Sequence, residues 1–86
     1  MARSTASPQI LLLHSCDTVA VCLRKVTAGE SLIAADQVLV AQQSIPAGHK
    51  VAIKKHHLGQ PVIKFGWTIG QARTSIQPGE HVHTHN

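Results

Sequence analysis

Short apolar runs separated by glycines occupy most of this chain, and such a pattern predicts β-strands rather than helices. The stretch 46–70 is the clearest example: it contains the runs Val-Ala-Ile and Pro-Val-Ile and the chain's single Phe and single Trp. In the stretch 17–23, alternation places Val19 and Val21 on one face and Ala20 and Cys22 on the other. The predicted strands are residues 9–14, 17–23, 31–35, 38–42, 49–55, 62–65, 71–76 and 81–85.

The turn signals recur regularly. Glycines at 48, 59, 70 and 79 are separated by eleven, eleven and nine residues, a spacing typical of a small sandwich, barrel or clip. The segments 28–30, 46–49 and 78–81 resemble one another only as turns, so the sequence indicates no internal repeat. We expect a mostly β domain of short strands and glycine turns over residues 9–86, preceded by a flexible N-terminal tail over residues 1–8.

The amino-acid composition limits the size of the hydrophobic core and indicates the cellular compartment. The 86 residues make one domain, and with one Phe, one Trp and no Tyr its core must be aliphatic and thin. No apolar run approaches the ~20 residues of a membrane span, so we expect no membrane partner and a cytoplasmic location. Cys16 and Cys22 lack zinc-ribbon spacing, which predicts free thiols in core or strand positions.

The formal net charge of +4 favours negatively charged partners. Nucleic acid is not expected, because the longest basic run is only the four residues 54–57 and no aromatic array is present to stack bases. An acidic metabolite or an acidic protein surface fits the charge better. The His56-His57 pair should point to opposite sides of a strand end, and we interpret it as a solvated turn.

The histidines are the candidate functional residues, since seven occur in the chain. His81, His83 and His85 alternate, so in a strand all three point to one face, where His81 and His83 can chelate a metal. The alternative is an exposed polar end that binds nothing. His49-Lys50 follows a glycine turn and can hold a carboxylate or phosphate, unless Lys50 only lies along the sheet with its ammonium in water.

The chain does not look like a self-sufficient enzyme. No nucleophile elbow, Gly-rich phosphate loop or Ser-His-Asp arrangement is present. The four carboxylates are too scattered for paired acid–base work: Asp17, Glu30, Asp36 and Glu80.

Four sequence motifs, in this order along the chain, resemble those of one family: H-x-x-D-x-V-A-V from His14, I-P-x-G-H-K-V-A from Ile45, V-I-K-F-G-x-x-I-G from Val62, and G-E-H-V-H-T-H-N from Gly79. This is the SAF domain or small subunit of the altronate dehydratase–galactarate dehydratase family, related to the small subunit of sulfolactate sulfo-lyase. The resemblance runs from about residue 10 to residue 86. Two departures are Thr18, where relatives often carry Asn, and Phe65, where Tyr is frequent.

The resemblance implies a β-clip fold. It also implies that the chain is the small subunit or N-terminal domain of a hydro-lyase that removes water from a sugar acid. In that role the chain is inactive alone and acts with a larger catalytic lyase chain. It also implies a divalent metal, expected to be iron(II), held mainly or jointly with that partner. By position it implies catalytic His83 and His85, substrate-binding His49, Lys50 and Asn86, and metal ligands His81 and His83. Two alternatives are the small subunit of a sulfolactate sulfo-lyase and a non-catalytic carbohydrate- or acid-binding module.

Overall fold

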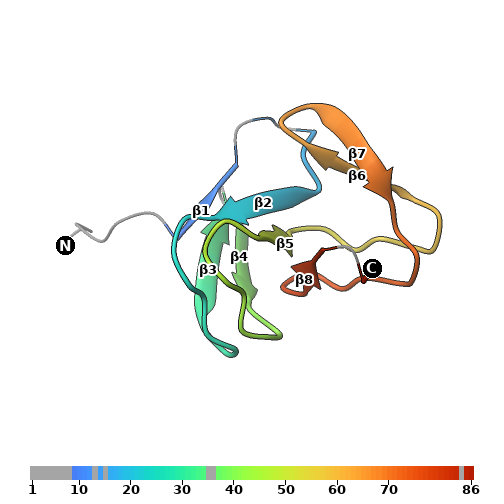
Figure 1. Ribbon diagram of the computed structural model, residues 1–86. Coiled ribbons are helices and arrows are strands. Elements are labelled where there is room, and N and C mark those ends of the chain that lie inside the picture. The colour runs from blue at the N-terminus through green and yellow to red at the C-terminus, as the bar shows by residue number, and fades with distance from the viewer. Residues whose placement is uncertain (1–8, 13, 15, 35–36, 84) are drawn as a thin grey trace.

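The computed structural model describes residues 9–12, 14, 16–34, 37–83 and 85–86, and its regular elements are all strands (Figure 1). A four-stranded antiparallel sheet has the order β1-β2-β5-β8. Two separate hairpins, β3–β4 and β6–β7, complete the fold. The bounds are β1 Ile10–Leu11, β2 Val19–Cys22, β3 Ser31–Ala34, β4 Gln37–Val40, β5 Lys50–Ala52, β6 Pro61–Lys64, β7 Trp67–Gln71 and β8 His81–Val82. The prediction of a small, mostly β domain of short strands and glycine turns is confirmed; the predicted tail lies outside the described residues.

Each hairpin packs against one face of the central sheet, so apolar side chains of the sheet are buried on both faces (Figure 1). As predicted, β2 alternates: Ala20 and Cys22 join the core beneath β3–β4, while Val19 joins the core beneath β6–β7. Val21, expected on the same face as Val19, is only half-buried and belongs to neither core. In β5, Val51 belongs to the first core and Ala52 to the second. Both cores are aliphatic, and the two aromatic side chains lie outside them, with Trp67 77% exposed.

Four nine-residue segments, which we call turn units, make the corners of the fold: residues 22–30, 41–49, 52–60 and 72–80. Each begins with a small buried residue, has a buried side chain at its fifth position and a glycine with φ between 85° and 91° at its eighth. Only glycine adopts this conformation without strain. The fifth positions are Val26, Ile45, His56 and Ile76.

The turn units bond to one another in pairs. In the first pair, Gly29 N–H donates to Ala41 O and Gly48 N–H donates to Cys22 O, both at 2.8 Å. The second pair repeats this scheme, with Gly59 N–H donating to Ala72 O and Gly79 N–H donating to Ala52 O. Backbone bridges join Val26 to Ile45 and His56 to Ile76 at the centres of the two pairs. The chain is therefore an internal repeat of strand, turn, hairpin, turn and strand, in which β5 ends the first half and begins the second.

The sequence interpretation missed this repeat, although a signal for it exists. The pattern Ala-x-x-Ser-Ile-x-x-Gly occurs at 41–48 and again at 72–79. The offset between equivalent residues is 30 before the hairpins and 31 after them, and the β6–β7 ladder accommodates the additional residue as a register shift between Val62 and Ile63. A β-bulge of this kind is the usual way to insert one residue into a paired strand.

Several predicted boundaries were wrong. Residues 71–76 do not form a strand: β7 ends at Gln71, and the segment that follows is the fourth turn unit. The last strand ends at Val82 rather than residue 85. Cys16 lies exposed in a turn rather than in a core or strand, whereas Cys22 is buried in β2, and both are free thiols as predicted.

His56 also differs from expectation, because it is 1% exposed and does not belong to a solvated turn. It occupies the fifth position of its turn unit, where the other three units bury Val or Ile. Its Nε2 lies 2.7 Å from Thr18 Oγ1, which also accepts a hydrogen bond from Ile63 N–H at 2.9 Å. Desolvation by burial lowers the pKa of His56 below its ordinary value of 6.5.

Asp17, beside Thr18, is 1% exposed and accepts a hydrogen bond on Oδ1 from Gly66 N–H at 2.7 Å. This contact holds the tight loop of the β6–β7 hairpin, in which Phe65 has φ of 54° and Gly66 of 80°. A bulky residue in this region is strained by about 1–2 kcal/mol. Asp17 and Thr18 therefore dock the second hairpin onto the end of β2.

The turn glycines give a matched pair of variants. Gly29→Ala should lower the free energy of unfolding by about 1–2 kcal/mol, because alanine is strained at the φ of +90°. No further loss is expected, since no atom lies within 4 Å of the added Cβ. Gly79→Ala has nearly the same φ, +91°, but its Cβ would overlap the Val40 carbonyl oxygen. We expect an additional loss of about 1–3 kcal/mol, measured by urea denaturation; equal losses in the two variants would contradict the close approach.

The buried His56 predicts acid sensitivity. Because its folded-state pKa lies below 6.5, only the unfolded chain takes up the proton there. The free energy of unfolding should therefore be highest above about pH 6.5 and fall as the pH drops below it. His56→Val, which introduces the residue of the first turn unit, should reduce this slope in urea denaturation at pH 7.5, 6.5 and 5.5. The control His57→Val, at an exposed neighbour, should keep the slope, and an unchanged slope in His56→Val would refute the assignment.

Candidate functional site

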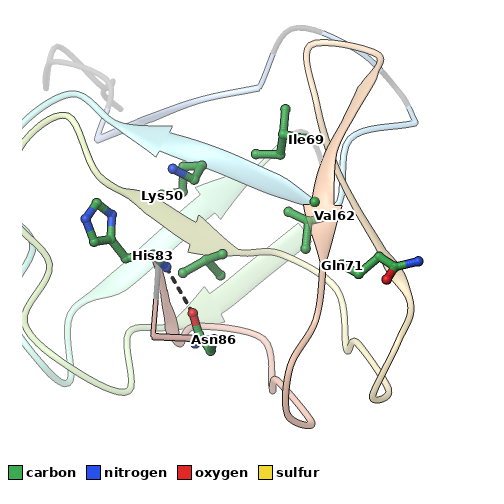
Figure 2. A pocket seen from close by; sticks show the side chains of 8 residues that line it. Lys50, Val62, Ile69, Gln71, His83 and Asn86 are labelled. Carbon is green, nitrogen blue, oxygen red and sulfur yellow. Dashed lines mark hydrogen bonds between the residues drawn. The ribbon is translucent and has the colours of Figure 1, made fainter.

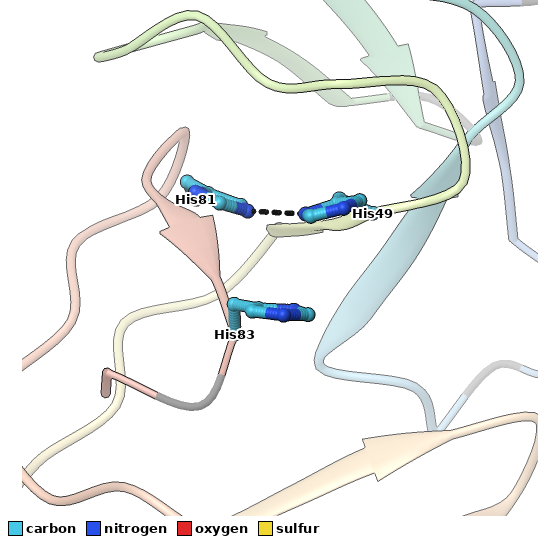
Figure 3. Close-up of side chains that lie close together, drawn as sticks. All are labelled: His49, His81 and His83. Carbon is cyan, nitrogen blue, oxygen red and sulfur yellow. Dashed lines mark hydrogen bonds between the residues drawn. The ribbon is translucent and has the colours of Figure 1, made fainter.

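Three histidines from two distant segments come together beside the edge strand β8 (Figure 3). His49 ends the second turn unit, His81 lies in β8, and His83 follows β8. Their potential ligand atoms all lie within 4.8 Å of one another. We call these three residues the histidine cluster.

The ring geometry is close. His49 Nδ1 and His81 Nε2 are 2.9 Å apart, a hydrogen-bond distance. Figure 3 shows the His83 ring lying nearly parallel to this pair, and its centroid is 4.5 Å from that of His49, with 19° between the ring planes. The His85 ring lies farther along, 5.3 Å from His81. The predicted grouping of His81, His83 and His85 is thus reproduced around His81, although not by one continuous strand.

His49 is available for this cluster because of the residue three positions before it. In the other turn units the ninth residue uses its side chain to accept a hydrogen bond from a backbone N–H: Glu30 from Thr27, Gln60 from His57 and Glu80 from Gln77. In the second unit the corresponding residue is Pro46, which has no N–H to satisfy. The ninth position is therefore released from capping, and its imidazole points to His81.

The segment that carries His81 and His83 is fixed through its backbone. His81 pairs with Val51 in the β5–β8 ladder, and its N–H donates to Gln43 Oε1 at 2.8 Å. Asn86 is buried and clamps the end of the chain: its Nδ2 donates to His81 O at 2.8 Å, and its Oδ1 accepts from His83 N–H at 2.9 Å. Its carbonyl oxygen also accepts a hydrogen bond from Arg73 N–H.

Burial and neighbouring charges favour the neutral forms of His81 and His83. Desolvation lowers the pKa of His81 below 6.5, and the neighbouring charges of His49, His85, His83 and Lys50 lower it further. The pKa of His83 is lowered in the same way, first by desolvation and then by His49, Lys50 and His85. Neutral imidazoles are both proton acceptors and metal ligands, so the arrangement favours either use.

A pocket of about 240 Å³ adjoins the cluster (Figure 2). Figure 2 shows Lys50 and His83 on one side of it and Ile69 and Gln71, from β7, on the other. Lys50 supplies a cation and Gln71 a neutral hydrogen-bonding group, while Val62, Ile69 and Val82 supply apolar surface. Such a mixture suits a small polar molecule with a negative end.

Most of the predicted site residues meet here. His49, Lys50, His81, His83 and His85 lie around the cluster, while Asn86 lines the pocket with its side-chain amide already bonded to backbone. The roles assigned to these residues from the resemblance stay predictions. Sequence reasoning missed Gln71 and the backbone anchor Gln43, and it named Asn86 as substrate-binding without indicating that Asn86 anchors the backbone. No local pattern indicates which distant residue a polar side chain will reach.

Comparison with known proteins supports the resemblance. Residues 8–86 match the altronate/galactarate dehydratase SAF domain. The chain is similar to altronate dehydratase of Escherichia coli strain K12, with 37% identity over 91% of the chain, and of Bacillus subtilis strain 168, with 35% identity over 86%. It spans only 16% and 15% of the lengths of those proteins.

A second group of relatives consists of proteins shorter than the altronate dehydratases. The (2R)-sulfolactate sulfo-lyase subunit alpha of Paracoccus pantotrophus is 48% identical over 56% of the chain and 72% of the relative.

Within the part of the chain that the structure describes, no helix has the length and apolar character needed to cross a membrane.

The geometry of the cluster predicts an NMR result. His49→Gln removes the first charged neighbour that lowers the pKa values of His81 and His83, so both values should rise toward 6.5. The rise will be partial, since desolvation is the larger cause. The pKa values are read from imidazole chemical shifts between pH 4 and 8. Lys25→Gln, at an exposed lysine of the first turn unit, is the control and should move neither; unchanged values in His49→Gln would contradict the cluster.

Proposed function

Because the chain belongs to the altronate/galactarate dehydratase SAF domain family, we propose that it is the small subunit or N-terminal domain of an altronate dehydratase-like hydro-lyase. In this proposal it acts with a larger catalytic chain and eliminates water from a sugar acid in the cytoplasm. The observation that carries the proposal is the histidine cluster beside Lys50 at the open pocket. The short span of the match within the altronate dehydratases supports the need for a larger chain.

The chemistry of the site fits a polyhydroxy carboxylate. Elimination of water from such a substrate removes the proton next to the carboxylate and expels a hydroxyl group. In this proposal the Lys50 ammonium binds the substrate carboxylate. Asn86 lines the pocket and His49 belongs to the adjoining cluster, and both are proposed to contact the substrate. His83 and His85, both exposed, are the groups proposed to accept or return a proton.

The proposed reaction also uses a divalent metal ion, iron(II), held mainly or jointly with the larger chain, with His81 and His83 as the ligands on this chain. A His83 imidazole that ligates the ion has no free lone pair for a proton, so proton transfer then falls to His85. Neutral imidazoles are suitable ligands for iron, so the residues fit the ion. When bound, such an ion polarises a substrate oxygen and eases departure of the hydroxyl group.

A second candidate is the small subunit of a sulfolactate sulfo-lyase. The supporting observation is the identity to subunit alpha in two organisms, 48% over 56% of the chain in Paracoccus pantotrophus and 47% over 52% in Chromohalobacter salexigens. That substrate is also a small anion, and Lys50 would serve it equally well. A non-catalytic carbohydrate- or acid-binding module is the third candidate, and the convergence of three imidazoles argues against it.

The test is an affinity pull-down of the tagged chain from its native extract, followed by assays for dehydration of altronate and galactarate and for desulfonation of sulfolactate with added iron(II). We expect a larger protein to co-purify with one of these activities. His83→Ala should lower that activity by about 10²-fold or more, the usual contribution of a proton-transfer group, while the exposed His57→Ala should not. Full activity of His83→Ala would remove the catalytic role, and a partner without any of the three activities would refute the lyase assignment.

A further inference from the structure

We propose that the histidine cluster by itself is a binding site on this chain for a divalent first-row transition metal ion, with His49, His81 and His83 as the three protein ligands. This deepens the proposed function, because it places a complete set of protein ligands on the small chain and adds His49 to the pair expected from sequence. Its test does not depend on lyase activity.

The positions of the nitrogen atoms suit a metal ion. Ligand nitrogens of a tetrahedral site with bonds of about 2.05 Å are ~3.3 Å apart. His49 Nδ1 and His81 Nε2, at 2.9 Å, need to separate by only a few tenths of an ångström. The His83 nitrogen lies within 4.8 Å of both and must approach them. Because His83 is exposed, its ring can turn inward without displacing packed side chains.

The short contact between His49 and His81 has a direct interpretation in this proposal. At 2.9 Å one of the two rings must donate its N–H to the other. A metal ion would take the place of that shared proton, and the donating ring would carry its proton on the other nitrogen. Both rings already direct a nitrogen into the same space, so little reorientation is required.

The backbone holds the ligands in place before any ion binds. Pro46 frees His49 from the capping role that Glu30, Gln60 and Glu80 perform in the other turn units. Hydrogen bonds from Gln43 and Asn86 anchor the backbone of His81 and His83. A site whose ligands are fixed in this way loses less conformational entropy on binding.

The donor set selects the kind of ion. Three imidazoles without a carboxylate suit zinc, cobalt, nickel or iron rather than magnesium or calcium, which prefer oxygen. Three protein ligands leave at least one coordination position open, as in catalytic zinc sites. His83, one of the three ligands, also lines the pocket beside Lys50, so a hydroxyl or carboxylate oxygen of an acid bound there could complete the coordination.

The experiment is isothermal titration calorimetry of the tag-free 86-residue chain with Zn²⁺ and with Co²⁺ at pH 7.5, together with the visible absorption of bound Co²⁺. We expect one ion per chain and no heat with Mg²⁺. His83→Ala, at an exposed position, should weaken the affinity at least ~10-fold, and His49→Ala should do the same. His57→Ala should bind like the wild type, and circular dichroism checks that each variant is folded.

Absence of binding at submillimolar metal, or equal affinity in the wild type and both cluster variants, would overturn the inference. The outcome is separable from the proposed function. A lyase assembly that is active although the isolated chain binds no metal would overturn this site alone. A chain that binds metal at the cluster, but whose assembly has no lyase activity, would overturn the proposed function alone.

Discussion

The backbone pairing between turn units is the constraint on which the rest of this fold depends. Strands of two to five residues offer few hydrogen bonds of their own, so the sheets cannot define the domain alone. In each pair of turn units, two glycine amides bond to the carbonyls of two small buried residues, and a backbone bridge joins the centres. The fourth turn unit also approaches the first half closely, because a β-carbon on Gly79 would overlap the carbonyl oxygen of Val40 in β4.

The same turn geometry explains why the histidine cluster has its location. Four structurally equivalent corners carry Glu, His, Gln and Glu at the ninth position, and all but the histidine cap a backbone amide. Replacing the amide-bearing residue by Pro46 in one corner removes the need for a cap without changing the backbone path. The function of this corner is therefore separable from its structural role, and the imidazole of His49 is free to meet those of a strand that is distant in sequence.

The sequence predicted the class of fold well because glycine turns and β-branched runs are local signals. The regions of β2, β3, β4, β5 and β6 were all recognised, with ends that differ by a few residues. The strand expected over 71–76 failed because Ala72 and Ile76 are apolar for another reason: they are the first and fifth positions of a turn unit. His56 misled in the opposite direction, since a histidine beside two lysines looks solvated until its equivalence to Val26 is known. The approach of His49 to His81 depends on the β5–β8 register, which no local pattern discloses. The histidines themselves were identified from the resemblance and from the His-x-His spacing.

Because β5 closes the first half of the repeat and opens the second, it forms a wall of both cores. Val51 packs into one core and Ala52 into the other, so neither half can melt without exposing apolar surface in its neighbour. The two halves should therefore unfold as a single cooperative unit, without a stable half-folded species. The histidine cluster combines a residue from the end of the first half with residues from the end of the second, and it exists only in the fully folded chain. Its ability to bind a ligand is consequently linked to the global stability of the domain rather than to that of one loop.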